Sequence, residues 1–349
     1  MLQIEIDSVR QIAAEYEKEV NTGYLTSIKK GLNKLYNFLL TSHLPNSCIL
    51  MGYVRSILGM LEPKGVFGKK SLLMLEPQEF KNVEKKSFFA LRDYDLNMKI
   101  KIGETTRLFH EWITYYLHYS DIRRYIYPKY LDKLSIKTCV YCNAEFISTC
   151  HLKKYDKLGN AIKKANGEYE MDGKGRFELD HYWPKSKHPF LSISFFNLHP
   201  SCSSCNLWKE DGDIPFNLFT NINNAPSLFS FFLKEEDVIE YVNTHQRECL
   251  KMHFASKIKN YECFHVEEVY DSFKDEVEEL FWKKVSNGVS YLDLLRKSLP
   301  KDLVIDPDLL HRFFYGYYRD PKDILKRPLT KMKQDIAIQL EKLAPKIEV

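Results

Sequence analysis

The stretches CVYC (139–142), ELDHYWPK (178–185) and NLHPSCSSCNLWK (197–209) decide how this chain folds. They carry two close cysteine pairs, with acid, imidazole and amide side chains between and beside them. Two Cys-x2-Cys pairs are a common way of presenting four thiolates to one tetrahedral ion. Residues 143–201 separate the pairs, so this segment must return to its start and form a compact subdomain. The sequence therefore predicts a structural zinc ion held by Cys139, Cys142, Cys202 and Cys205.

Two other interpretations of the cysteines stay open, namely a redox dithiol or two unrelated pairs. A redox dithiol needs only one Cys-x2-Cys, placed where a strand ends and a helix begins, and it gives no reason for a second pair. Spacing alone does not identify the metal.

Composition excludes several classes of protein. The 349 residues are 44% hydrophobic and 14% aromatic, enough for a packed core without disulfides. The net charge of +4 comes from 51 basic and 47 acidic residues, so the chain is no polycationic nucleic-acid binder. The first residues do not resemble a signal peptide, and no stretch approaches the roughly 18 apolar residues of a membrane span. We expect a cytoplasmic protein without a membrane segment, in which eight cysteines do not form disulfides.

The pattern along the chain predicts an α+β fold that is mainly α-helical. Residues 1–130 form a helical N-terminal region, residues 131–225 a zinc-clamped core, and residues 226–349 a helical C-terminal region. Apolar residues at helical spacing carry the first assignment: Ile28, Leu32, Leu35 and Leu39, and then Phe109, Trp112, Ile113 and Tyr116.

Within the core we expect Ala144–Thr149 to pair with Arg176–His181 as a hairpin. The insert between them, residues 150–176, is polar and rich in lysine. It is either a solvated hairpin or a flap that contacts phosphates.

The residues between and beside the cysteine pairs suggest hydrolytic chemistry. A histidine with an ordinary pKa near 6.5 is suited to take a proton from water, which makes His181 the candidate general base. Mg²⁺ prefers oxygen ligands and keeps several waters, so Asp180 and Asn206 are candidate ligands of a catalytic Mg²⁺ or Mn²⁺ ion. Asn197 either orients His181 or holds the adjoining loop through hydrogen bonds to the backbone. Lys209 is a candidate phosphate contact.

Each of these residues also has an ordinary structural explanation. An isolated Asp-His dipeptide is usually a surface pair, and an isolated asparagine before an apolar residue usually marks a turn. Residues 115–130 interleave tyrosines with Arg123, Arg124 and Lys129, which suits either a packed helix face or a surface that stacks on bases.

The ordered set resembles the HNH endonuclease superfamily, in particular its subgroup with a zinc-clamped ββα-metal core. The resemblance covers residues 139–209 and rests on motif positions in family order: Asp180-His181, Pro184, Ser186, Asn197-Leu198, Cys202, Cys205, Asn206 and Lys209. It implies that His181 is the base, Asp180 and Asn206 are ligands of the catalytic ion, Asn197 is the central motif residue and the cysteines bind zinc. Asn206 stands at a position that is often histidine, so this is an H-N-N variant, and an amide favours Mg²⁺ or Mn²⁺.

The segments LDHYWPKSK (179–187), NLHPSC (197–202) and RPLTKM (327–332) also look like the HNH proteins encoded beside an ABC-type ATPase in bacterial anti-phage systems such as Septu and certain retrons. This resemblance implies an endonuclease that cuts DNA in antiviral defence and works with an ATPase partner. One alternative is an RNase or tRNA-cleaving toxin on the same scaffold. The other is a non-catalytic, zinc-stabilised module that docks nucleic acid or an ATPase.

Overall fold

The computed structural model describes residues 2–61, 70–86, 89–164, 166–222, 227–285, 294, 297–298 and 306–343. The protein is α+β and mainly helical, as the sequence predicts, and in the described residues its strands form small sheets of two strands each. The chain divides into two compact units. The N-terminal unit comprises Gln3–Leu134 and Ser148–Ala225, and the C-terminal unit gathers Met1–Leu2, Ser135–Ile147 and Pro226–Val349. The three consecutive regions expected from the sequence stay a prediction.

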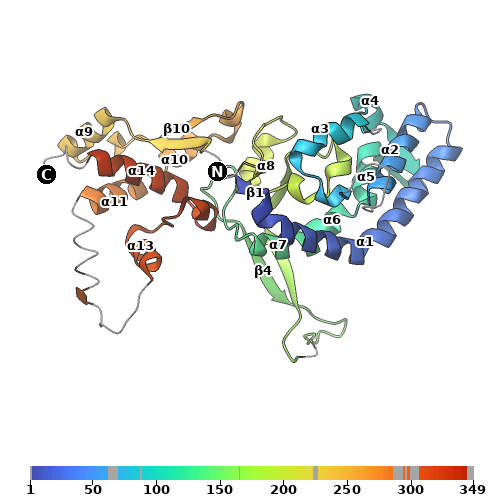
Figure 1. Cartoon of the computed structure of the whole chain (residues 1–349), viewed down its shortest axis with the longest axis horizontal. Coiled ribbons are helices and arrows are strands. Elements are labelled where there is room, and N and C mark those ends of the chain that lie inside the picture. Colours follow the sequence, from blue (N-terminus) through green and yellow to red (C-terminus); the bar gives the residue numbers. More distant parts are fainter. Residues whose placement is uncertain are drawn as a thin grey trace. The chain divides into compact units, whose positions relative to one another are not determined.

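The N-terminal unit begins with a long helix, α1 (Ile6–Thr41), which packs against α2, α5 and α7 (Figure 1). Its predicted face is buried at Ile28, Leu32, Leu35 and Leu39. Tyr16 on the same helix donates a hydrogen bond from its hydroxyl to the carbonyl oxygen of Ile193 at 2.9 Å, and its ring packs edge-on against Tyr130 with centroids 5.3 Å apart. The helix therefore braces the loop that precedes residue 197.

The other helices of this unit are short: α2 (Ser47–Met60), η1 (Leu72–Met74), α3 (Pro77–Lys86), α4 (Asp93–Leu96), α5 (Phe109–Tyr116), α6 (Tyr119–Asp121), η2 (Ile122–Ile126), α7 (Tyr127–Lys133), η3 (Pro189–Leu191), η4 (Phe195–Asn197) and α8 (Ser203–Lys209). The predicted face of α5 is buried at Phe109, Trp112, Ile113 and Tyr116, as expected. The segment η2 is a turn of π-helix.

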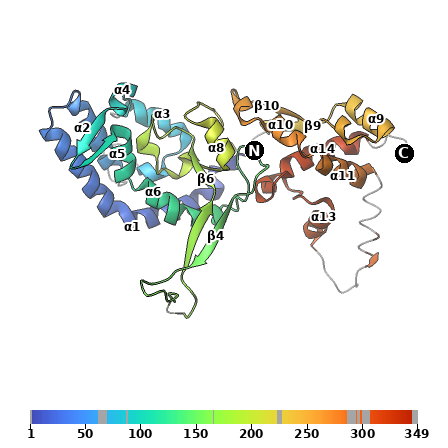
Figure 2. The ribbon, with the colours of Figure 1, turned by 180° about the vertical axis from the view of Figure 1, so that it is seen from behind.

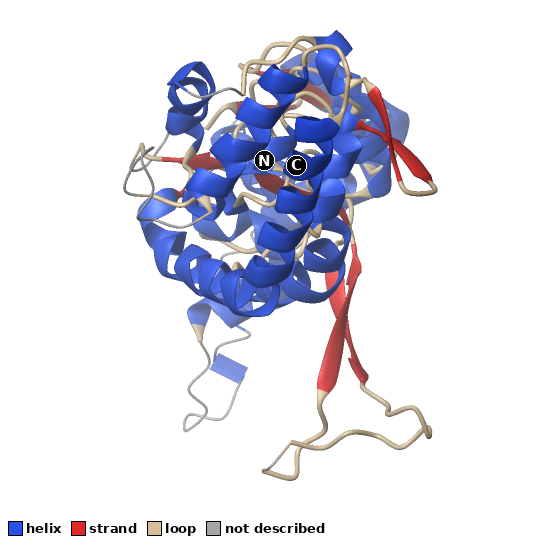
Figure 3. Cartoon of the chain, turned by 90° about the vertical axis from the view of Figure 1, so that its right-hand side faces the viewer, coloured by secondary structure: helices blue, strands red, loops and turns tan. Residues whose placement is uncertain are grey.

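Among its described residues, the N-terminal unit has four sheets. Their strands are β1 (Ile4–Glu5) with β8 (Phe219–Thr220), β2 (Lys99–Ile102) with β3 (Thr105–Leu108), β4 (Ser148–Lys153) with β5 (Met171–Arg176), and β6 (Glu178–His181) with β7 (Leu198–Ser201). The first pair is parallel and the other three are antiparallel. Figure 3 shows the β4–β5 ribbon extending away from the helices of this unit. The insert is therefore a hairpin, and its role as a flap stays a prediction.

The expected pairing of Ala144–Thr149 with Arg176–His181 is confirmed only where Ser148 pairs with Arg176, and it is otherwise wrong. The first of these segments splits, because the amide of Ile147 donates to Lys137 at 3.0 Å in a local loop while Ser148 opens β4. The second segment splits at Phe177, so that β5 pairs with β4 while β6 pairs with β7. The two ends of the insert thus pair with each other as β4 and β5. Residues 178–181 pair instead with β7, which leads into the second cysteine pair.

The C-terminal unit packs helices around the antiparallel pair β9 (Phe229–Phe232) and β10 (His253–Ser256) (Figure 2). Its helices are α9 (Glu235–Thr244), η5 (Arg247–Cys249), η6 (Tyr261–Phe264), α10 (Val266–Asp271), α11 (Lys274–Val285), α13 (Pro307–Tyr315), η7 (Pro321–Lys326) and α14 (Thr330–Leu343). Helix α14 lies against β9 and α11. Its charged residues Lys331 and Lys333 are buried and paired, with Asp335 at 2.6 Å and Glu276 at 2.5 Å.

Candidate functional site

Four cysteines form a group suited to a metal ion. The sulfur atoms of Cys139, Cys142, Cys202 and Cys205 lie within 4.8 Å of one another, all four residues are buried, and none is in a disulfide. Zinc with Zn–S bonds of about 2.3 Å holds its four sulfurs roughly 3.8 Å apart, so the group fits a tetrahedral ion. The four cysteines predicted from the sequence thus come together in a buried group that can hold a metal ion such as zinc.

The first cysteine pair sits in a tight turn braced by tyrosines. The amide of Asn143 donates to the carbonyl oxygen of Cys139 at 2.9 Å, and Asn143 adopts a left-handed backbone with φ of 54°. The carbonyl oxygens of Tyr141 and Cys142 accept hydrogen bonds from the hydroxyls of Tyr261 at 2.7 Å and Tyr270 at 2.9 Å. These bonds satisfy buried carbonyls and set the direction of the turn.

Asn143 also ties this turn to the segment RPLTKM (327–332). Its side-chain amide donates to Thr138 at 2.9 Å and to the carbonyl oxygen of Ile324 at 3.0 Å, while its side-chain oxygen accepts from the amide of Lys331 at 3.1 Å. Its own carbonyl accepts from the amide of Leu329 at 2.8 Å. Sequence reasoning missed Asn143, although an asparagine just after a cysteine turn is a known candidate for left-handed backbone.

The second cysteine pair opens helix α8. Cys202 is its N-cap residue, and its sulfur accepts a hydrogen bond from the amide of Cys205 at 3.5 Å. Strand β7 ends at Ser201, so β6, β7 and α8 follow one another as two antiparallel strands and a helix. This order puts Asn206 and Lys209 on a helix that begins at the cysteines.

Lys209 turns back from α8 to the end of β6. Its ammonium lies 3.0 Å from one carboxylate oxygen of Asp180 and 3.2 Å from the other, and it donates to the carbonyl oxygen of His181 at 2.9 Å. Both side chains are almost fully buried, with 1% of Lys209 and 7% of Asp180 exposed. The helix directs the ammonium of Lys209 towards a buried carboxylate, and the expected phosphate contact of Lys209 stays a prediction.

His181 is buried and held by a backbone carbonyl. Its Nε2 lies 3.1 Å from the carbonyl oxygen of Ser192, which can only accept, so Nε2 carries the proton. Burial lowers the pKa of His181 well below its ordinary value, and the charge of nearby Lys185 lowers it further. The imidazole is therefore neutral near pH 7, and Nδ1 is its unprotonated, basic nitrogen.

Asn197 holds the loop that supplies that carbonyl. Its side-chain oxygen accepts from the amide of Trp183 at 2.8 Å, and its side-chain nitrogen donates to the carbonyl oxygens of Trp183 and Leu191, both at 3.1 Å. Leu191 precedes Ser192, the partner of His181. Two roles were considered for Asn197, namely orienting His181 and holding the adjoining loop. The structure favours the second role, and by holding the loop Asn197 also positions the imidazole of His181 indirectly.

Asp180, His181 and Asn206 line one cavity of about 200 Å³, which Lys209 does not line. Charged residues surround them: Glu178, Glu210 and Asp211 are acidic, and Arg123 and Lys185 are basic. Tyr119 completes this wall, with its ring centroid 5.0 Å from that of His181 and its hydroxyl donating to the carbonyl oxygen of Leu179 at 3.1 Å. Tyr119 and Arg123 come from α6 and η2, which are far from β6 in the chain, so no local pattern marks them as neighbours of His181.

The donor set of this cavity suits a hard divalent ion. Asp180 offers a carboxylate and Asn206 an amide oxygen among the lining residues of this cavity, and Mg²⁺ and Mn²⁺ accept both kinds of ligand. Because the Lys209 ammonium already neutralises Asp180, such an ion would have to share that carboxylate.

Comparisons with models of protein families, with curated proteins and with solved structures gave no match for this chain. No helix in the described residues is both long and apolar enough to cross a membrane.

Proposed function

We propose that this protein is a metal-dependent endonuclease of the HNH type, with β6, β7 and α8 as its ββα-metal core. One observation carries the proposal: Asp180, His181 and Asn206, predicted from their order in the sequence, line the same cavity. Asn197, the fourth motif residue, bonds the loop whose carbonyl orients His181. The four-cysteine group adds support, because Cys202 and Cys205 begin the helix that carries Asn206.

In this proposal His181 is the general base. A neutral imidazole whose Nε2 proton is engaged by Ser192 can accept a proton from water only at Nδ1. Asp180 and Asn206 would hold Mg²⁺ or Mn²⁺, which when bound would stabilise negative charge on the phosphate. Asn197 keeps the Ser192 carbonyl in place, so it acts as a positioning residue. The buried setting of His181 keeps its base form available at pH values where a solvent-exposed histidine would be partly protonated.

Cleavage assays on supercoiled plasmid, single-stranded DNA and tRNA, with Mg²⁺, Mn²⁺ or a chelator, test the proposal. We expect nicking or linearisation of the plasmid, dependent on the added metal. His181→Ala should lower the rate about 10²- to 10⁴-fold, the usual contribution of a general base. His151→Ala is the matched control, because this histidine is half exposed and pairs with Asp132 outside the cavity.

The result that overturns the general-base role is a His181→Ala protein, folded by circular dichroism, that cleaves as fast as the parent. Cleavage confined to tRNA would assign the scaffold to the RNase alternative. Nucleic-acid binding with no cleavage under any metal condition would assign it to the non-catalytic docking module.

A partnership with an ABC-type ATPase in anti-phage defence belongs to the same proposal and rests on the sequence resemblance. Lys331 of the RPLTKM segment that contributes to that resemblance is engaged internally with Asn143 and Asp335, whereas Arg327 of the same segment is exposed. Affinity purification of the protein from cells that express the neighbouring genes tests the partnership. Recovery of the protein without any ATPase, under conditions that preserve known complexes, would count against it.

A further inference from the structure

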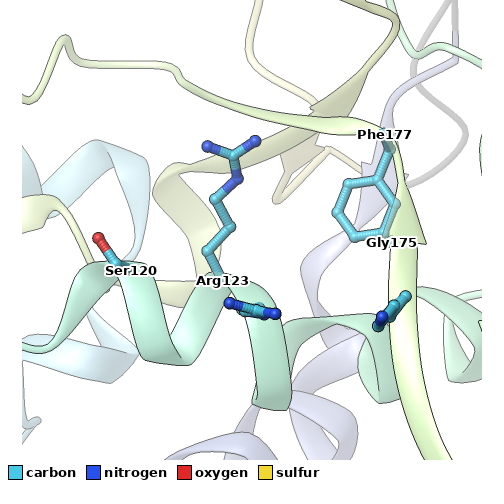
Figure 4. Close-up of a pocket in the computed structure, with 6 residues that line it drawn as sticks. Ser120, Arg123, Gly175 and Phe177 are labelled. Carbon is cyan, nitrogen blue, oxygen red and sulfur yellow. The ribbon is translucent and has the colours of Figure 1, made fainter.

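A second cavity, of about 350 Å³, adjoins the one lined by His181 and has the opposite electrostatic character. It is lined by Ser120, Arg123, Arg124, Lys174, Gly175 and Phe177, which include three cations and no carboxylate. Figure 4 shows Ser120 and Arg123 on the helical side of this cavity and Gly175 and Phe177 on the strand that faces it. Arg123 lines both cavities.

The helical wall owes its charge to the π-helical turn η2. This turn places Arg123 and Arg124, consecutive in the sequence, along the same cavity. A π-helical turn is energetically unfavourable compared with a regular helix and is found often at functional sites. The alternative considered from the sequence, a packed helix face that carries two surface arginines, is consistent with buried Tyr119, Tyr127 and Tyr130. The structure adds that both arginines line one cavity together with Lys174.

The strand wall comes from β5, where glycine allows a close fit. A side-chain carbon added at Gly175 would lie 2.5 Å from the ring of Phe177, and one added at Gly173 would lie 3.3 Å from Pro128 of α7. Glycine at these positions lets the ribbon lie against α7 and keeps Phe177 in the wall. Lys174, between the two glycines, is exposed at the cavity.

Two of the three cations have no acidic partner within the part of the chain that the structure describes. Among the described residues, neither Arg124 nor Lys174 takes part in an ion pair, and Arg124 has the ring of Tyr125 as its neighbour, 5.2 Å from guanidinium carbon to centroid. Arg123 is paired with Glu178 at 2.5 Å, on the side of the acidic cavity. Exposed cations converging on a cavity without carboxylates form a site for an anion, and arginine suits the forked geometry of a phosphate.

We propose that this basic cavity binds a backbone phosphate of the nucleic-acid strand, next to the phosphodiester that is cleaved. This inference rests on the proposed function. Arg123 lines both cavities, so a phosphate bound in the basic cavity would lie next to the cavity of His181. Half-buried Phe177 supplies an aromatic surface beside the phosphate, as in sites that hold single strands or splayed bases.

The test is binding of fluorescently labelled DNA and RNA oligonucleotides by anisotropy, without added divalent ions so that no cleavage occurs. Arg124→Ala combined with Lys174→Ala should weaken binding about tenfold, because charge-assisted bonds to a phosphate are lost. The slope of log affinity against log salt should fall by about one, the signature of one phosphate contact. Inorganic phosphate should compete weakly with the oligonucleotide for binding to the parent protein. It should not compete for binding to the double variant.

The matched control is Lys30→Ala combined with Lys34→Ala, two exposed lysines on α1 that lie outside both cavities and remove the same charge. Lys174→Glu alone serves as a second variant if the double substitution fails to fold. Equal affinity and equal salt slope for parent, double variant and control would overturn the inference.

Cleavage by the parent separates this outcome from failure of the proposed function. A protein that cleaves DNA but binds independently of Arg124 and Lys174 is a nuclease without this phosphate site. A protein that never cleaves yet loses binding in the double variant has the site without the nuclease activity. Absence of any binding would overturn the phosphate site, and absence of both binding and cleavage would overturn both proposals.

Discussion

Two neighbouring antiparallel pairs in the N-terminal unit use polar residues in opposite ways. In β6–β7 Asp180, His181 and His199 are buried, while in β4–β5 most side chains are exposed. Buried polar groups need partners, and these three have them: Asp180 pairs with Lys209, His181 with the carbonyl oxygen of Ser192, and His199 with the amide of Leu218. Exposed polar groups on the β4–β5 ribbon stay hydrated and need no partner within the protein. The strand pair β6–β7 can therefore support chemistry that requires a fixed histidine tautomer, whereas the strand pair β4–β5 can offer charged side chains to a binding partner.

The β4–β5 ribbon supplies a matched control residue for each test of the strand pair β6–β7. Cys150 and His151 lie on β4 and Lys154 follows it, and they correspond in type to Cys202, His199 and Lys209. If burial is the difference that matters, substitutions at the first three positions should leave stability and its pH dependence almost unchanged, and those at the last three should alter one or the other.

The largest effect is expected from Cys202→Ser, at the end of β7. Loss of one thiolate should abolish stable zinc binding and lower the free energy of unfolding by more than about 5 kcal/mol, because structural zinc contributes directly to folding. Metal analysis should find about one zinc per chain in the parent. Thermal and chemical unfolding of Cys202→Ser and Cys150→Ser provide the measurement. A Cys202→Ser protein as stable and as zinc-loaded as its Cys150→Ser control would contradict the structural-zinc prediction.

The next effect is expected from Lys209→Met. Its loss leaves the buried carboxylate of Asp180 without the ammonium 3.0 Å away, which should destabilise the protein by roughly 3 to 5 kcal/mol. Lys154→Met should change stability by less than about 1 kcal/mol, because its pair with Glu170 is exposed to water.

Urea unfolding of both variants, and of Lys209→Met combined with Asp180→Asn, measures the coupling. Removing both charges should recover part of the loss, because no unpaired carboxylate stays buried. Strictly additive losses would show that the Asp180–Lys209 pair is not the reason for the instability.

The smallest effect is a pH dependence that originates at His199. Burial lowers the pKa of His199 from its ordinary 6.5 to about 3, and nearby Lys209 lowers it further. Below pH 6.5 the unfolded chain takes up a proton that the folded protein does not, so stability is complete above pH 6.5 and falls as the pH drops towards 3. By pH 5 the loss from this group is roughly 2 kcal/mol.

His199→Gln should reduce the slope of the stability profile between pH 6.5 and 5, a window above the titration of most carboxylates. Part of the slope should persist, because burial also lowers the pKa of His181 and His188. Nε2 of His199 accepts from the amide of Leu218 at 3.2 Å, and glutamine can also accept, so the substitution removes the titration with least change in bonding. His151→Gln, on the exposed ribbon, should leave the profile as in the parent. An unchanged slope in His199→Gln would mean that this imidazole is not kept neutral by burial.

Local patterns predicted the parts of this protein that depend on local spacing. The helical faces of α1 and α5 follow from apolar residues three or four apart, because neighbours on a helix are set by the sequence alone. The four-cysteine group was predictable because few arrangements other than a shared metal explain two Cys-x2-Cys pairs. The β2–β3 hairpin was missed, although Gly103, with φ of 63°, marks its turn between two short alternating stretches.

Partners far apart in the chain could be found only in three dimensions. The pairing of β6 with β7 depended on where the backbone of residues 144–147 made its own bonds, and the sequence carries no signal for that competition. The same holds for the Ser192 carbonyl that orients His181 and for the burial of Lys209, whose ammonium pairs with Asp180. Residue types and their spacing in the sequence identify the groups that are able to do chemistry. Desolvation and contacts between distant segments decide the protonation state and the partner of each group.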